Sequence, residues 1–138
     1  MQARLTARLA GDLSTYSELS YADYMVLVAL SDSAGARLRL FQLAAELGWE
    51  KSRVSHQIAR MTERGLVAKQ RCGDDRRGAY VEATERGRKA IEAAAPRHVE
   101  TVRRLFIDRL TSEQLDAIAA AAETILGVLD AEEADGDG

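Results

Sequence analysis

The sequence is poor in the residue types that build cross-links and reactive centres. Its 138 residues include one cysteine, one proline and two histidines, and aromatic residues make up only 5%. A single cysteine excludes an internal disulfide framework and is typical of a reducing cytoplasm. Because no run of about 18 apolar residues occurs, we expect no membrane-spanning helix. The first residues also lack the continuous apolar core of a secretion signal.

The same scarcity argues against an enzyme or a metalloprotein. The two histidines and the cysteine lie far apart, and no glycine-rich phosphate loop, HExxH or CxxC motif occurs. The adjacent carboxylates of Asp74 and Asp75 lie in a glycine-containing stretch that is typical of a turn and not of a catalytic pair. We therefore expect no catalytic residues, no cofactor and no metal.

The residues that are plentiful favour a helical protein with one basic region. Hydrophobic residues make up 46%, and the dominance of alanine and leucine favours helices. The length suits one domain, or one domain with an appended dimerisation part. The net charge is −3, but residues 49–80 contain eight bases and four acids, so this stretch carries +4 and the remainder −7. Because salt screens charges beyond about 8–10 Å, such a local basic patch can still bind phosphate.

Two short helical patterns, separated by a glycine, precede a hairpin pattern. In the first helix apolar residues recur at steps of three and four, which places them on one face: Leu40, Leu43, Ala44 and Leu47. Gly48 suits the left-handed conformation that ends a helix. The second helix ends at Gly65 and buries Val54, Ile58 and Met61. This order predicts a helix-turn-helix followed by a β-wing, an arrangement that places one helix in a DNA groove.

The opposite face of the second helix is polar and basic, and no acid occurs between Lys51 and Arg60. Short hydroxyls allow close approach to DNA, Arg53 can bind guanine or phosphate, and Gln57 can pair with adenine. A merely solvated face is the alternative, although such a face usually interleaves opposite charges. We predict DNA contacts for Lys51, Ser52, Arg53, Ser55, His56, Gln57 and Arg60.

The wing is predicted from two extended patterns, residues 66–71 and 79–83, joined by a loop with two glycines and two aspartates. Arg76 and Arg77 lie near its tip, where protein cannot bury them, and arginine suits a narrow, negative minor groove. We predict that both arginines bind DNA. The alternative is a solubilising tip in which the aspartates pair locally; one aspartate could also orient an arginine before binding.

The run SRVSHQIARMTERGLVAKQRCGDDRRGAYVEATERGR, which begins at Ser52, resembles the MarR family of bacterial transcription regulators. The family's wing pattern is Asp-x-Arg, a strand, and then Leu-Thr-x-x-Gly; this chain has Asp75-Arg76-Arg77 and later Thr84-Glu85-Arg86-Gly87. It departs at Ala83, where the family usually has leucine, which affects packing under the wing more than function. The resemblance covers nearly the whole chain. It implies a winged helix-turn-helix, mainly α with a small β-hairpin (α+β), and a third strand at residues 37–39.

Helical patterns flank residues 20–87, the predicted DNA-binding domain. The first covers residues 3–19, with an apolar stripe of Leu5, Leu9, Leu13 and Tyr16. Ser20 followed by Asp23 then matches the N-terminal cap of a second helix. After the wing, a long helix capped by Thr84 is predicted to reach about residue 110. Pro96 lies inside it and must kink the helix or break it in two.

The last helix is predicted to begin at Thr111, because Thr111 with Gln114 matches the reciprocal capping pattern. Its apolar stripe is Leu115, Ile118, Ala119, Ala122, Ile125, Leu126 and Leu129. Residues 1–19 and 88–130 have no globular body of their own to cover. We therefore expect them to join their copies in a second subunit, as the family resemblance also implies. The acidic tail, residues 131–138, is predicted to be disordered.

These patterns together predict a cytoplasmic transcriptional repressor that binds a palindromic operator as a homodimer, with half-sites about one helical turn apart. In the resembled family, small aromatic or phenolic compounds often bind where the DNA-binding lobe meets the dimer body, and they release the DNA. Tyr16, Tyr21, Tyr24 and His98 are the candidates for lining such a crevice. Ordinary packing, with a hydrogen-bonded histidine, is the simpler alternative for these four residues.

Two other interpretations stay open. Cys72 lies close to Arg71 and Arg76, which favour a reactive thiolate and hence a redox-sensing regulator. Relatives that sense oxidants carry the reactive cysteine near the N-terminus, where this chain has none, so an inert thiol is the alternative. A winged helix can also bind a protein partner, but that role does not require Arg53, Arg76 and Arg77 to be exposed together.

Overall fold

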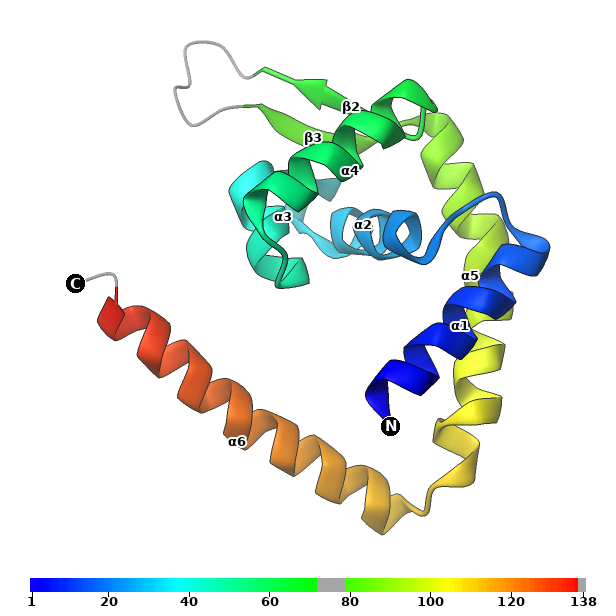
Figure 1. The fold of residues 1–138 in the computed structure, drawn as a ribbon, viewed down its shortest axis with the longest axis vertical. Helices are drawn as coiled ribbons and strands as arrows, with labels where there is room; N and C mark the ends of the chain where they lie inside the picture. The colour runs from blue at the N-terminus through cyan, green and yellow to red at the C-terminus, as the bar shows by residue number, and fades with distance from the viewer. Residues whose placement is uncertain (72–78, 137–138) are drawn as a thin grey trace. The chain divides into compact units, whose positions relative to one another are not determined.

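The computed structural model describes residues 1–71 and 79–136, and the chain divides into two compact units, Met1–Val99 and Glu100–Gly138. Most described residues are helical and one small antiparallel sheet is present, so the predicted α+β winged-helix class is confirmed (Figure 1). None of the described helices is long and apolar enough to cross a membrane. The elements in chain order are α1 (Gln2–Tyr16), α2 (Tyr21–Asp32), η1 (Ala34–Ala36), β1 (Arg37–Arg39), α3 (Leu40–Leu47), α4 (Lys51–Glu63), β2 (Val67–Gln70), β3 (Tyr80–Ala83), α5 (Glu85–Leu105), η2 (Ile107–Arg109) and α6 (Ser112–Gly136).

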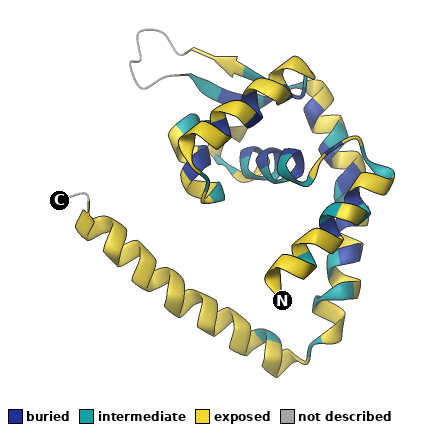
Figure 2. Cartoon of the chain, in the orientation of Figure 1, coloured by how far each residue is buried: buried dark blue, intermediate teal, exposed yellow. Residues whose placement is uncertain are grey.

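The helix-turn-helix consists of α3 and α4, as predicted. α3 ends at Gly48, whose φ of 64° is left-handed, a conformation that glycine adopts without strain. The inward faces of the two helices are completely buried at Leu43, Ile58 and Met61. Figure 2 shows these faces in dark blue against α2, so the predicted apolar stripes form the core of the first unit.

The sheet has three strands in the order β1-β3-β2, with β3 antiparallel to both neighbours. β2 and β3 are the predicted strands of the wing. The third strand that the family resemblance implies is also present: Leu38 in β1 pairs with Val81, which is completely buried. Val67 pairs with Ala83 at the other side of β3. The sheet therefore closes over the helical core.

Thr84 and Gly87 fix the root of the wing. The backbone N–H of Thr84 donates to the carbonyl of Leu66 at 3.1 Å, and its hydroxyl donates to the carbonyl of Gly65. The same hydroxyl accepts from the N–H of Gly87 at 3.1 Å, which caps α5. A Cβ on Gly87 would lie 2.0 Å from the Leu66 carbonyl oxygen. The Thr-x-x-Gly pattern therefore joins the start of α5 to the start of the wing.

The flanking helices of the first unit share this core. Leu13 of α1 is completely buried, and Ile91 and Ala94 of α5 belong to the same hydrophobic cluster. α5 continues through Pro96, so the predicted alternative of a broken helix is wrong. Pro96 is exposed, and so is Glu92, whose carbonyl loses its helical partner, so water can satisfy that carbonyl.

The second unit contains the end of α5, η2 and α6. The predicted cap is present, because the N–H of Thr111 donates to Gln114 Oε1 at 3.0 Å and the N–H of Gln114 donates to Thr111 Oγ1 at 3.2 Å. α6 runs to Gly136, so the predicted disorder of the tail is wrong for residues 131–136. Alanine and glutamate, both strong helix formers, occupy residues 131–134. No residue of α6 is buried in the described chain.

Candidate nucleic-acid interface

The outward face of α4 gathers the side chains that the sequence predicted for DNA contact, with one exception. Six of the seven are exposed: Lys51, Ser52, Arg53, Ser55, His56 and Arg60. The opposite face of α4 packs on the core through the buried side chains of Val54, Ile58 and Met61. α4 has no acidic residue in its first turn, so the positive end of its dipole is not neutralised from within. From Lys51 to Arg60, α4 therefore presents cations and hydroxyls with no carboxylate between them.

Arg53 is held by an aromatic ring that precedes the helix. Its guanidinium carbon lies 3.9 Å from the centroid of the Trp49 ring. A stacked guanidinium keeps its N–H donors in its own plane, so they stay available to phosphate or to a base edge. Trp49 lies in the turn between α3 and α4 and is not among the predicted contacts. Trp49 and Arg53 are four residues apart across the start of the helix, and this spacing was the available sign that they are in contact.

Gln57 is not exposed, which contradicts its predicted contact with adenine. Only 5% of its surface is accessible. Its Nε2 donates to Asp23 Oδ1 at 2.6 Å, and its Oε1 accepts from Arg60 at 2.9 Å. Both ends of the amide are therefore used inside the protein. The reason is geometric: Gln57 follows Val54 by three residues and precedes Met61 by four, so it lies on the buried face of α4.

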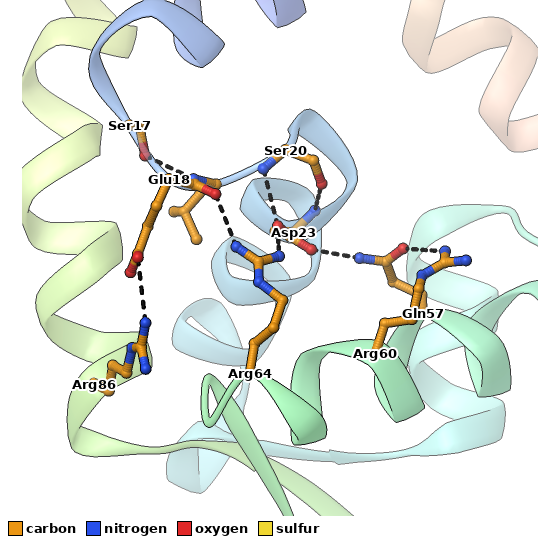
Figure 3. Close-up of polar contacts among 9 residues, drawn as sticks. Ser17, Glu18, Ser20, Asp23, Gln57, Arg60, Arg64 and Arg86 are labelled. Atoms are coloured by element: carbon orange, nitrogen blue, oxygen red, sulfur yellow. Dashed lines mark hydrogen bonds and ion pairs between the residues drawn. The ribbon is translucent and has the colours of Figure 1, made fainter.

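Asp23 is the centre of a polar network that sequence reasoning recognised only as a helix cap. Its cap role is present, because the N–H of Asp23 donates to Ser20 Oγ at 3.1 Å and the N–H of Ser20 donates to Asp23 Oδ2 at 2.9 Å. Arg64 also donates to Asp23 Oδ2 at 2.5 Å and to the Glu18 carbonyl at 2.8 Å. Figure 3 shows the network joining the segment before α2 to the C-terminal half of α4.

A second arginine cluster lies on the sheet. Arg37 and Arg39 both stack on the Tyr80 ring, each with 4.3 Å between guanidinium carbon and ring centroid. Arg39 is buried and donates to the Tyr80 hydroxyl at 3.1 Å. Alternate residues of a strand share one face, so the Arg-x-Arg pattern of β1 was the available signal. Sequence reasoning had assigned this segment only a strand.

The wing tip and its neighbours lie outside the described residues. These positions include Arg76 and Arg77, the two predicted DNA contacts, and Cys72, the candidate for redox sensing. Their assignments stay predictions. Among the residues that the structure does describe, no group of three or more His, Cys, Asp or Glu side chains could hold a metal ion.

Three of the four residues predicted to line an effector crevice, Tyr21, Tyr24 and His98, form an aromatic cluster. The His98 ring lies 4.4 Å from the Tyr24 ring and 6.0 Å from the Tyr21 ring, between centroids. Arg97 stacks over Tyr16 at 4.3 Å. Burial lowers the pKa of His98 below its ordinary value of 6.5, although the Asp12 carboxylate opposes part of this. Burial likewise raises the pKa of Tyr24. Both side chains are therefore uncharged at neutral pH.

A cavity of about 370 Å³ lies beside this cluster. Residues of α2 and the end of α3 line it: Tyr21, Tyr24, Met25, Val28, Ala29, Asp32, Ser33, Glu46 and Leu47. Tyr21 and Tyr24 are thus both cavity and cluster residues, whereas Tyr16 and His98 are not in its wall. The Tyr16 hydroxyl is buried and has no hydrogen-bond partner among the described residues.

Comparisons with known proteins agree with this architecture. A model of the MarR family matches residues 17–78. The transcriptional regulator HosA of Escherichia coli is 31% identical over 98 residues, which cover 70% of this chain and 70% of HosA. AbsC, a MarR family transcriptional regulator from Streptomyces coelicolor, is 41% identical, with a TM-score of 0.87 over 94% of this chain and 87% of AbsC.

A structure solved with DNA is also similar to this chain. It is Sco3205, a MarR family transcriptional regulator from Streptomyces coelicolor in complex with DNA, which is 31% identical. Its TM-score is 0.85, and the alignment covers 91% of this chain and 78% of Sco3205. The winged helix, the Thr-x-x-Gly root of the wing and the likeness over nearly the full length agree. The chain therefore belongs to the MarR family of transcriptional regulators.

Proposed function

We propose that this regulator is a repressor that binds a palindromic operator as a homodimer, with α4 in the major groove and the wing in the neighbouring minor groove. The observation that carries the proposal is the outward face of α4, where Lys51, Arg53 and Arg60 are exposed and no acid intervenes. Cations in this arrangement neutralise phosphates and release counterions. The likeness to Sco3205, which was solved with DNA, supports the same assignment.

The first turn of α4 is the part best suited to phosphate and bases. Its free backbone N–H groups and dipole attract an anion, and Lys51 and Ser52 extend from the same turn. The Arg53 guanidinium at the start of the helix is stacked on the Trp49 ring, which restricts its orientation before DNA binds. Ser55 and His56 continue the face. Arg76 and Arg77 complete the proposed contact from the wing.

The proposed dimer is supported by apolar surface that the chain leaves uncovered. α6 has no buried residue, and five large apolar side chains along it are 44–61% exposed: Ile118, Ile125, Leu126, Val128 and Leu129. An exposed apolar stripe of this length is typical of a subunit interface. We assign α1, the end of α5 and α6 to an interface with a second copy, which places two α4 helices on one duplex.

The proposed effector site is the cavity lined by Tyr21 and Tyr24. Two aromatic rings and several apolar side chains suit a small aromatic ligand. Asp32 and Glu46 are the charged residues among its described lining, and both are acidic. A neutral phenol should therefore bind better than the corresponding carboxylate. A ligand shifts the DNA affinity only if it prefers one arrangement of the two lobes.

Selection of bound duplexes from a random DNA pool tests this function. We expect a palindrome whose half-sites lie about one helical turn, or about 10 base pairs, apart, and a dimer in sedimentation of the free protein. An unpaired single half-site would contradict the dimer. Failure of the protein to retain any duplex at low salt would favour a protein partner and remove the DNA-binding proposal.

A further inference from the structure

The contacts in Figure 3 lead from α2 through the protein to the outward face of α4. We propose that Asp23 is a positioning residue for DNA binding: through Gln57, it holds the Arg60 guanidinium in the orientation in which it meets the duplex. Asp23 is 2% exposed, and among the described contacts it reaches Arg60 by way of Gln57. The inference rests on the proposed function, because it takes Arg60 as part of the DNA-binding face.

The charge of Asp23 decides which way the Gln57 amide points. An ionised carboxylate only accepts hydrogen bonds, so Gln57 must turn its NH₂ group towards Asp23 Oδ1, where the distance is 2.6 Å. The amide oxygen then faces away from Asp23. There it accepts from Arg60 at 2.9 Å. An apolar side chain at position 23 would impose no orientation on the Gln57 amide.

The carboxylate itself is fixed from its other side. Asp23 Oδ2 accepts from the N–H of Ser20 at 2.9 Å and from Arg64 at 2.5 Å. Arg64 also donates to the Glu18 carbonyl, and Glu18 pairs with Arg86 at 3.3 Å. Two donors thus meet Oδ2, whereas Oδ1 meets only Gln57 among the contacts described. This asymmetry determines how a substituted side chain would sit.

Arg60 lies on the face of α4 that carries the other predicted contacts. It follows His56 by four residues and Arg53 by seven, spacings that share one side of a helix. A free arginine side chain samples many rotamers, and ordering it upon binding weakens affinity. The hydrogen bond from Gln57 restricts the guanidinium before DNA arrives. The interior network therefore prepares an exposed cation for its ligand.

Asp23→Asn separates this role from simple electrostatics. Because two donors face Oδ2, the asparagine places its oxygen there and turns its NH₂ towards Gln57. Gln57 must then flip to accept, which leaves its own NH₂ facing Arg60 and removes that hydrogen bond. We expect the affinity for the selected operator to fall about fivefold to tenfold. Loss of a negative charge alone would instead strengthen DNA binding.

Glu63→Gln is the matched control. It likewise replaces one carboxylate by an amide, at the exposed C-terminal end of α4, outside the network. We expect this variant to bind the operator as tightly as the wild type or slightly tighter. An equal loss of affinity in both variants would overturn the proposal, since the effect would then not depend on Gln57 or Arg60.

Two further variants test the route from Asp23 to Arg60. Gln57→Glu, added to Asp23→Asn, supplies two acceptor oxygens, one for the asparagine NH₂ and one for Arg60. We expect it to restore the operator affinity to within about twofold. In an Arg60→Ala background, Asp23→Asn should have no further effect. If Asp23 were purely structural, Gln57→Glu would not restore the affinity, and Asp23→Asn would still weaken binding in the Arg60→Ala background. Either of these results would overturn the proposal.

Gln57→Met keeps the experiment decisive if Asp23→Asn does not fold. It preserves the pair between Asp23 and Arg64 and removes the Gln57 amide, and with it both the acceptor of Arg60 and the donor to Asp23 Oδ1. Unchanged operator affinity in this variant would overturn the proposal. A loss of affinity that disappears when Gln57→Met is made in the Arg60→Ala background would support it. Absence of DNA binding in the wild type would remove the proposed function together with this inference. A wild type that binds while Asp23→Asn binds equally well removes the inference alone.

Discussion

Gly87→Ala is expected to destabilise the protein by displacing the root of the wing. The added Cβ would lie 2.0 Å from the Leu66 carbonyl oxygen, about 1.4 Å inside the 3.4 Å at which ordinary contact begins. This neighbour is backbone and cannot rotate away. Separation of α5 from the wing would weaken the bonds that join Thr84 to Leu66 and to Gly87. Each costs about 1 kcal/mol, and the steric strain adds about 1–3 kcal/mol.

The expected total of about 3–5 kcal/mol corresponds to a Tm about 10–20 °C lower for a chain of this size. Thermal unfolding followed by circular dichroism measures this shift. Gly11→Ala is the matched control, because Gly11 lies inside α1 with nothing within 4 Å of its Cβ position. That variant should gain about 0.5–1 kcal/mol. A Gly87→Ala protein that melts within about 2 °C of the wild type would refute the account of the wing root.

Three other substitutions test separate parts of the account. Arg77→Ala should weaken operator binding without lowering the Tm, since the wing tip is predicted to contact DNA; titration of labelled duplex and a melting curve measure both. Leu126→Glu should convert the dimer to a monomer in sedimentation, because it places a charge in the proposed interface. His98→Gln should reduce the loss of Tm on acidification. The pKa of His98 is lowered in the folded state, so the unfolded chain binds more protons and stability is lost as the pH falls below about 6.5.

Each of these three has a contrary outcome. A large loss of Tm with intact binding would remove Arg77 from the DNA interface. A Leu126→Glu protein that stays dimeric would place the subunit contact elsewhere. If His98→Gln and the wild type lose Tm equally between pH 7.5 and 5.5, about one unit either side of the ordinary histidine pKa, protonation of His98 does not set the acid sensitivity.

The local features of the fold could be predicted because local chemistry determines them. Gly48 and the pair Thr111 and Gln114 mark helix ends through their own backbone bonds, and the structure contains both. The tail was mispredicted because its net charge was weighed above the helix propensity of alanine and glutamate. Pro96 was expected to kink or break α5, yet the helix is continuous there because one lost bond at an exposed position is tolerated.

The polar network was harder to predict because it joins residues far apart in sequence. Gln57 was assigned outward by its polarity, although its spacing from Val54 and Met61 places it inward. Its partner Asp23 precedes it by 34 residues, and Arg64 reaches the same carboxylate across 41 residues. Pairing of this kind depends on how α2 and α4 pack. Helical spacing predicts a buried position, but it cannot name the buried partner.

The central claim is that the outward face of α4 binds a duplex through its cations. Operator affinity measured over a range of salt concentrations tests this claim most directly. Lys51, Arg53 and Arg60 of two subunits supply six cations at about −0.9 each, so α4 alone should make the logarithm of affinity fall with the logarithm of salt at a slope of about −5, and the predicted contacts of Arg76 and Arg77 should steepen it. Arg53→Ala should make that slope shallower by about 1–2. A slope near zero, or the same slope in wild type and variant, would contradict the claim.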